Sequence, residues 1–222
     1  MSGSVEAAKT YFQQYQESPA EAYMAARGLA EVATKFGLGY VRSAQIGHER
    51  YRGMLAIPYR RPAGGAHGVA TIRFRCIRDS CVKDENGEYY APHRKEKHEG
   101  HGKYQSLPGD PPRLYNTSAL IAPSPYMAVS EGEFDTQASE LAGVPCVAVQ
   151  GTGAWEPHFS LPLVGYERVF HVADGDEAGI KAAEKRAAQM PNGVVIQLDD
   201  GEDINSFIHA KGANAYRKKL GL

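Results

Sequence analysis

The chain has 222 residues, which is enough for one large domain or two small ones, each with its own hydrophobic core. Apolar residues make up 42% of it and charged residues 23%, as in ordinary soluble globular proteins, and no apolar run approaches the roughly 20 residues that a membrane-spanning helix needs. The three cysteines, Cys76, Cys81 and Cys146, make no disulfide framework, and no secretion signal opens the chain. The composition therefore argues against membrane-spanning and disulfide-rich secreted proteins and favours the cytoplasm.

The net charge of −1 conceals an asymmetry between the two halves. Residues 1–118 carry 17 Lys/Arg against 12 Asp/Glu, whereas residues 119–222 carry 8 against 14. Between Arg42 and Arg78, eight arginines accompany a single acid, Glu49. This distribution suits a protein that holds a polyanion with one half and metal cations with the other, although two solvated surfaces of opposite sign would give the same counts.

The first half is expected to be an α+β unit. Residues 5–17 and 20–36 are predicted helices, and Ser18 and Pro19 give the second one an N-cap and a first helical position. The short runs "MLAIPYR" and "VATIRFRCI", separated by "RPAGGAHG", predict a hairpin or meander. Residues 79–112 are polar and predict a long loop, which in a compact domain is usually functional or mobile.

The second half alternates strand-like and helix-like segments. The predicted strands are 126–130, 144–149, 168–173 and 193–198, and the predicted helices are 135–143, 176–190 and 204–220. This alternation predicts a Rossmann-like parallel sheet with flanking helices. The expected organisation is a basic N-terminal subdomain over residues 1–118 and an α/β subdomain with a C-terminal helix over residues 119–222.

Acidic residues follow three of these predicted strands. Glu131 follows the first, Asp174 and Asp176 follow the third, and "DDGED" at 199–203 follows the fourth. Ligands of parallel sheets bind beyond the carboxyl ends of the strands, and side chains two apart on an extended segment point the same way. Clustered carboxylates repel one another unless a cation or proton neutralises them, and oxygen ligands suit Mg²⁺ or Mn²⁺. The alternative for such acids, and for Asp176 in particular, is a helix N-cap.

The same segments resemble a known family. "VSEGEFDT" (129–136), "VADGDEAGIKAA" (172–183) and "DDGEDINSFI" (199–208) resemble the three signatures of the Toprim domain, with "QGTGAW" (150–155) between the first two. That domain is shared by primases, type IA and II topoisomerases, and some nucleases and recombination proteins. The runs "YMAARGLAEVATKFGLGYV", "YRGMLAIPYR", "IRFRCI" and "HGKYQSLPGDPPRLYN" resemble, in order, segments of the polymerase domain of DnaG-type primases. The resemblance covers residues 23 to about 220, and the chain is identified as a DnaG-type primase catalytic core in a minimal, phage-like version.

The resemblance assigns roles to the acids. It implies that the metal-binding carboxylates are Glu131, Asp174, Asp176 and Asp203. Asp135 joins them as a catalytic acid that supports Glu131 from one helical turn later. Asn205 stands where the family usually has a further acid; an amide oxygen can still bind a metal but adds no charge, and a helix cap is the alternative.

The resemblance also implies contacts with template or triphosphate in the basic half. Arg75 and Lys103 match family residues there, and an arginine fork suits phosphate oxygens. Arg52 and Arg113 lie nearby in the sequence and are weaker candidates, for which a solvated surface arginine is the alternative.

The implied activity is that of a DNA-directed RNA polymerase, which makes short RNA primers on single-stranded DNA by nucleotidyl transfer with Mg²⁺ or Mn²⁺. A Toprim nuclease or nickase and a non-catalytic single-stranded DNA-binding module of the replisome are the alternatives. The expected partners are template, ribonucleoside triphosphates, a replicative helicase and a separate zinc-ribbon initiation factor, in the cytoplasm of a bacterial host. The last two proteins are expected because residues 1–20 hold no cysteine and the chain ends soon after the Toprim signatures.

A group of cysteines and histidines in the long loop could bind zinc. Its members are Cys76, Cys81, His93, His98 and His101. Two cysteines and two histidines can form a tetrahedral zinc site, but the spacing is irregular and lacks a C-x₂-C pair. The alternative is a mobile, basic, histidine-rich loop that contacts nucleic acid.

Overall fold

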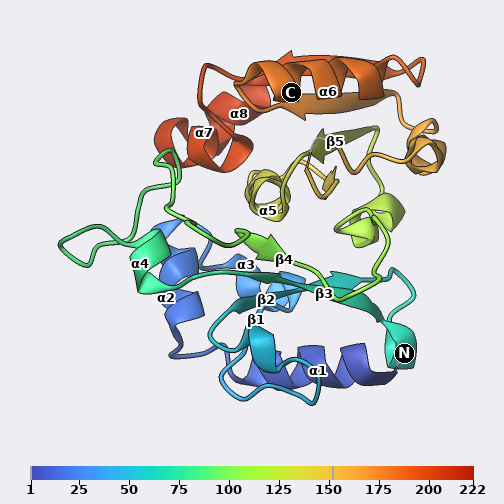
Figure 1. The fold of residues 1–222 in the computed structure, drawn as a ribbon. Coiled ribbons are helices and arrows are strands. Elements are labelled where there is room, and N and C mark those ends of the chain that lie inside the picture. The colour runs from blue at the N-terminus through green and yellow to red at the C-terminus, as the bar shows by residue number, and fades with distance from the viewer. Residues whose placement is uncertain (1, 152) are drawn as a thin grey trace. The chain divides into compact units, whose positions relative to one another are not determined.

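The computed structural model describes residues 2–151 and 153–222 and divides the chain into two compact units, Met1–Asp110 and Pro111–Leu222 (Figure 1). This boundary lies before the expected one after residue 118. Leu114 packs against the hydrophobic cluster of the second unit, and Tyr115 forms a β-bridge with Ala148, so this segment belongs with the second unit. None of the helices in the described part of the chain is long and apolar enough to cross a membrane.

The first unit is an α+β unit built on an antiparallel sheet with the strand order β1-β2-β3-β4. Its elements are α1 (Ser2–Gln13), α2 (Pro19–Ala26), α3 (Val32–Phe36), β1 (Gly39–Tyr40), β2 (Leu55–Arg60), β3 (Val69–Arg75), α4 (Asp79–Val82) and β4 (Tyr104–Gln105). The predicted hairpin is confirmed as β2 and β3, and α1 packs against β1 and β3. The long loop predicted over residues 79–112 is confirmed only in part, because α4 and β4 lie within that range and the loop that joins them is shorter.

The predicted single helix over residues 20–36 is wrong, because the chain forms α2 and α3 instead. Ser18 caps α2 through its side chain and Pro19 is its first residue, as expected. The helix stops at Arg27 because Gly28 takes a φ of +71°, a left-handed conformation that interrupts a right-handed helix.

The second unit is built on a parallel sheet with the strand order β6-β5-β7-β8, which confirms the predicted α/β class. Its elements are β5 (Tyr126–Ser130), α5 (Glu133–Leu141), β6 (Cys146–Ala148), β7 (Arg168–Ala173), α6 (Glu177–Ala187), β8 (Gly193–Gln197), α7 (Ile204–Lys211) and α8 (Ala213–Lys219). Helix α6 packs against β7 and β8, and α5 packs against β5, β6 and α7 (Figure 1). The predicted C-terminal helix is two helices, because Gly212 interrupts it at a φ of +84°.

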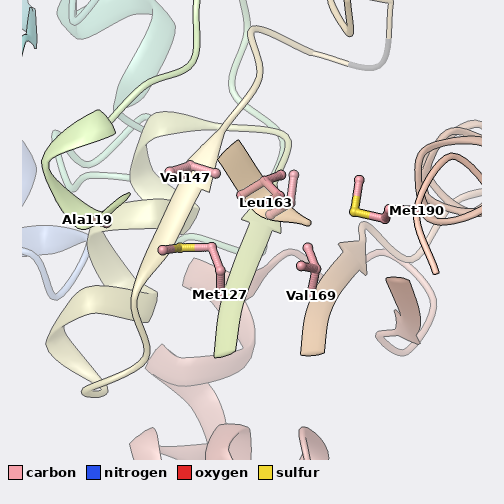
Figure 2. Close-up of a cluster of buried hydrophobic side chains, with 7 residues drawn as sticks. Ala119, Met127, Val147, Leu163, Val169 and Met190 are labelled. Carbon is pink, nitrogen blue, oxygen red and sulfur yellow. The ribbon is translucent and has the colours of Figure 1, made fainter. Parts of the chain in front are cut away.

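A cluster of buried hydrophobic side chains packs on one face of this parallel sheet (Figure 2). Its members are Ala119, Met127, Val129, Val147, Leu163, Val169 and Met190. Met127 and Val129 are two residues apart on β5 and therefore face the same side of the sheet. Burying each large apolar side chain stabilises the fold by roughly 1.5–3 kcal/mol. The same burial determines the strand register, because a shift by one residue would turn these side chains to the other face of the sheet. The cluster therefore fixes where the carboxyl ends of the strands, and the acids that follow them, are placed.

Candidate metal centre

The acids of the second unit are brought together by a close backbone contact between two loops. Gly175, which follows β7, donates its N–H to the carbonyl of Glu202 at 2.8 Å and accepts from the N–H of Gly201 at 3.1 Å. A Cβ on Gly175 would lie 1.9 Å from the carbonyl oxygen of Asp199, so no larger residue fits there without movement of the loop. The segment after β7 therefore lies directly against the segment after β8, which carries Asp203.

Asp174 is the centre of this acidic group. The pKa of Asp174 is raised to about 7, mainly by burial and also by the nearby carboxylates of Glu131, Asp203 and Asp176, while Arg186 acts in the opposite sense. The four acids follow three strands, and burial together with their mutual charge is enough for Asp174 to hold a proton near neutral pH. The structure thus places Glu131, Asp176 and Asp203 near enough to Asp174 for their charges to act on it, and the binding of metal by these four acids stays a prediction.

Two of these acids also cap helices, as the alternative interpretation of the sequence proposed. Asp176 Oδ1 accepts from the N–H of Gly179 at 2.7 Å and caps α6. Asp203 Oδ1 accepts from the N–H of Ser206 at 2.6 Å and caps α7 in a capping box. Each of these bonds uses one of two carboxylate oxygens, so capping orients the side chain and does not exclude a metal-binding role.

Asp135 and Asn205 contact each other. Asp135 is buried on α5, and its Oδ1 accepts from the backbone N–H of Asn205 at 3.0 Å. Asn205 lies buried inside α7 and is not its cap, because that position is held by Asp203. The cap interpretation of Asn205 was therefore wrong, and Asp135 ties α5 to the start of α7.

Two residues near the acids were missed by the sequence analysis. Arg186 is buried on α6 and its Nη2 donates to Glu131 Oε1 at 3.1 Å. His171 is fully buried on β7, and burial, followed by the charge of Arg186, lowers its pKa to about 3. Both had a signal in the sequence: Arg186 shares the buried helix face of Gly179 and Ala183, and His171 interrupts an apolar strand.

The predicted phosphate-binding residues fall in different surroundings. Lys103 and Arg52 are exposed in the first unit, and Arg113 is half-buried in the second. Arg75, by contrast, is 1% exposed, and its Nη2 lies 2.7 Å from Glu96 Oε2 while its Nε donates to Tyr23 at 2.9 Å. The contacts of all four with phosphate stay a prediction.

The predicted cysteine–histidine group is partly assembled. Cys76, Cys81, His98 and His101 bring one potential ligand atom each within 4.8 Å of one another. His93 is exposed and is not part of this group. Thr152 of the "QGTGAW" segment lies outside the described residues.

The acids of the second unit fit a hard divalent cation. Their donor atoms are carboxylate oxygens, which suit Mg²⁺ or Mn²⁺ and not a soft metal. Beside the effect of burial, the charges of Glu131, Asp203 and Asp176 raise the pKa of Asp174, and Arg186 opposes them. A bound cation would offset these negative charges.

Comparisons with known proteins agree with this geometry. Residues 128–208 match a family described as Toprim-like. The gene 57 protein of Mycobacterium phage D29 is 40% identical over 171 residues, which cover 77% of this chain and 99% of that protein. A DNA primase of Listeria innocua is 35% identical over 98 residues, which cover 41% of this chain and only 16% of the primase.

Solved structures extend the likeness to the first unit. The RNA polymerase domain of Mycobacterium tuberculosis primase DnaG, in complex with a double-stranded DNA oligomer with a 6-nucleotide overhang, gives a TM-score of 0.72 at 22% identity. The match covers 98% of this chain and 78% of that one, so both units have the fold of a primase catalytic core. The chain therefore belongs to the family of the gene 57 protein of Mycobacterium phage D29, contains a Toprim-like segment and has the fold of a DnaG primase catalytic core, as the resemblance of its motifs predicted.

Proposed function

We propose that the chain synthesises short RNA primers on single-stranded DNA by nucleotidyl transfer at the acidic group of the second unit. The observation that supports this proposal is the close contact of the acid-bearing segments after β7 and β8, where Gly175 N–H donates to the carbonyl of Glu202 and where Glu131, Asp203 and Asp176 lie near the buried Asp174. Such a concentration of negative charge is unfavourable in the protein alone and is characteristic of a site that receives cations.

The residues that would hold the divalent ions are Glu131, Asp174, Asp176 and Asp203. Bound there, two ions supply charge stabilisation to the attacking 3′-hydroxyl oxygen and to the leaving pyrophosphate. The protein's own part is to hold the acids in place: the capping bonds of Asp176 and Asp203 fix their rotamers, and Asp135 ties α7 to α5. Arg186 forms an ion pair with Glu131, and its positive charge limits the repulsion among the acids before ions bind.

In the basic half, Lys103, Arg52 and Arg113 would contact phosphates of template or incoming triphosphate. Lys103 and Arg52 are exposed, which supports this role. Arg75 is engaged with Glu96 and Tyr23, so contact of its guanidinium with a phosphate would require that network to open. Of these four residues, Arg75 is therefore the one least available to bind a phosphate.

The DNA bound to the Mycobacterium tuberculosis neighbour supports a DNA template for this chain as well. The further partners that we propose are ribonucleoside triphosphates, a replicative helicase and a separate zinc-ribbon initiation factor. The phage relative supports a place of action in the cytoplasm of a bacterial host.

A primer-synthesis assay tests the proposal. The full chain is incubated with single-stranded DNA, labelled ribonucleotides and Mg²⁺ or Mn²⁺, and the products are separated on a gel. We expect short labelled RNA from the wild-type chain and a loss of at least about 100-fold in Asp174→Asn, since a metal ligand is removed at the reacting centre. DNA binding should be retained in that variant.

Asp200→Asn is the matched control, because Asp200 is an exposed acid of the same loop region and should leave synthesis unchanged. Cleavage of the template without RNA synthesis would replace the proposal with a Toprim nuclease. Equal synthesis by wild type and Asp174→Asn would remove the acids from the mechanism.

A further inference from the structure

A second candidate metal site lies in the first unit and consists of Cys76, Cys81, His98 and His101. Cys76 follows β3, Cys81 lies in α4, and the two histidines lie in the long loop before β4. Two backbone hydrogen bonds fold this loop back: Lys97 N–H donates to the carbonyl of Cys81 at 2.9 Å, and Cys76 N–H donates to that of Lys103 at 3.0 Å. The irregular spacing in the sequence is therefore compatible with a compact group in space.

The distances among Cys76, Cys81 and His101 are close to those of a tetrahedral zinc site, and one ligand atom of His98 lies within 4.8 Å of the other three. Zinc binds sulfur at about 2.3 Å and nitrogen at about 2.0–2.1 Å, so tetrahedral geometry places two sulfurs about 3.8 Å apart and a sulfur and a nitrogen about 3.6 Å apart. The Sγ atoms of Cys76 and Cys81 lie 3.8 Å apart. His101 Nε2 lies 3.6 Å from Cys81 Sγ and 3.2 Å from Cys76 Sγ.

In each histidine, the ring nitrogen that would not bind the metal lies within hydrogen-bond distance of an oxygen acceptor, as is usual for histidine ligands of metals. Histidine ligands characteristically donate their other ring N–H to a carboxylate or a backbone carbonyl. His101 Nδ1 lies 3.0 Å from the carbonyl of Glu99, which leaves Nε2 toward the sulfurs. His98 Nε2 lies 2.7 Å from the carboxylate of Glu96, and its Nδ1 is buried with no hydrogen-bond partner. A buried imidazole nitrogen in that state is costly unless it binds something.

We propose that Cys76, Cys81, His98 and His101 bind one zinc ion. Both cysteines bind as thiolates, and the two protons that they lose pass to solvent. Two sulfurs and two imidazole nitrogens select zinc over Mg²⁺ or Mn²⁺, which prefer oxygen ligands. All four ligands belong to the first unit and none to the acidic group, so this site does not depend on the proposed function.

The zinc site would hold a buried polar network in place through Glu96. Besides His98, the carboxylate of Glu96 accepts from Arg75 Nη2 at 2.7 Å, from Tyr23 Oη at 2.6 Å and from Arg27 Nη1 at 3.3 Å. Glu96 is thus a positioning residue that links the metal to Arg75 at the end of β3.

Metal content of the purified full chain tests the site directly. The protein is expressed in zinc-supplemented medium, desalted and measured by mass spectrometry for zinc per chain. We expect about one zinc in the wild type and a loss of most of it in the double variant Cys76→Ser/Cys81→Ser. Cys146→Ser and His93→Gln are the matched controls and should keep the metal, because Cys146 lies in the second unit and His93 outside the group.

Cobalt spectroscopy tests the site on the wild-type protein alone, so that its result does not depend on whether a variant folds. Added Co²⁺ should give thiolate-to-cobalt charge transfer and the intense visible bands of a tetrahedral ion. In competition titrations, Glu96→Gln should weaken zinc binding by about 10–100-fold, as loss of a carboxylate behind a histidine ligand does. Glu99→Gln should leave it unchanged, because Glu99 contributes only its backbone carbonyl.

Three outcomes would overturn the proposal. The first is wild-type protein with almost no zinc and no tetrahedral cobalt spectrum. The second is zinc retained by the double serine variant, or lost equally in His93→Gln, which would indicate adventitious binding to surface histidines. The third is a Cys76–Cys81 disulfide in protein purified under reducing conditions, since those sulfurs would then be unable to bind the metal as thiolates.

Discussion

At the scale of single residues, Asp174 combines two opposed properties. Its pKa is raised to about 7 by burial and by neighbouring carboxylates, and the same charges would favour a bound cation at the proposed site. Function and stability therefore compete at this position, as is common where active sites gather like charges.

This competition leads to a prediction for Asp174→Asn. Above pH 7 the variant should be more stable than the wild type in the absence of metal, by about 1–3 kcal/mol, because it removes a carboxylate buried among three others. Urea unfolding in EDTA measures the difference. Asp200→Asn should leave the free energy of unfolding nearly unchanged, and a destabilised Asp174→Asn would show that the acids do not repel one another as described.

His171 provides a prediction for pH dependence. Its pKa is lowered from 6.5 to about 3 in the folded protein, so between these values the unfolded chain binds a proton that the folded chain does not. The contribution of the neutral, buried His171 to the free energy of unfolding is therefore fully present above pH 6.5 and is lost as the pH falls toward 3. His171→Phe should reduce this acid-side slope by up to about 1.4 kcal/mol per pH unit, measured by urea unfolding between pH 7 and about 4.

The control for this measurement is His209→Phe, because His209 is exposed on α7. Stability curves of wild type and His171→Phe that run parallel over the whole range would mean that His171 titrates normally in the folded state.

At the scale of elements, the loop after β7 depends on a residue without a side chain. Gly175→Ala would place a Cβ 1.9 Å from the carbonyl oxygen of Asp199 and force the two acid-bearing segments apart. We expect a loss of stability of about 2 kcal/mol or more and a larger loss of primer synthesis. Gly165→Ala, where a Cβ meets nothing within 4 Å, should change neither, as differential scanning calorimetry and the gel assay can show.

The strands were more predictable than the helices, for a physical reason. The runs at 126–130 and 168–173 are apolar, short and followed by acids, and the structure has β5 and β7 at these positions. The helices over 20–36 and 204–220 keep an apolar periodicity across Gly28 and Gly212. Periodicity alone does not reveal that these glycines take left-handed conformations, because that depends on the packing on either side.

The site was predictable in part. Acids after parallel strands must meet at one edge of the sheet, so Glu131, Asp174 and Asp203 could be grouped from the sequence. The burial of Arg75 could not be predicted from the sequence, because its partner Glu96 lies in a loop whose path no local sequence pattern predicts. For the same reason the sequence did not show which histidines approach Cys76 and Cys81.

At the scale of the whole molecule, the charge asymmetry predicts how DNA binding responds to salt. Each lysine or arginine that contacts a phosphate releases counterions, so removing one should lower the slope of log affinity against log salt by about 1. We expect this for Lys103→Ala and Arg52→Ala, measured by fluorescence anisotropy with single-stranded DNA between about 50 and 200 mM salt. Lys218→Ala, an exposed lysine of the acidic half, should leave the slope unchanged.

The proposed polymerase activity depends on divalent cations that bind among the acids of the second unit. Anomalous diffraction from crystals of the full chain soaked in manganese locates those ions directly. We expect manganese between Glu131, Asp174 and Asp203, with the peak absent in Asp174→Asn crystals. Manganese found only elsewhere, with these carboxylates bound to no ion, would contradict the proposed polymerase site.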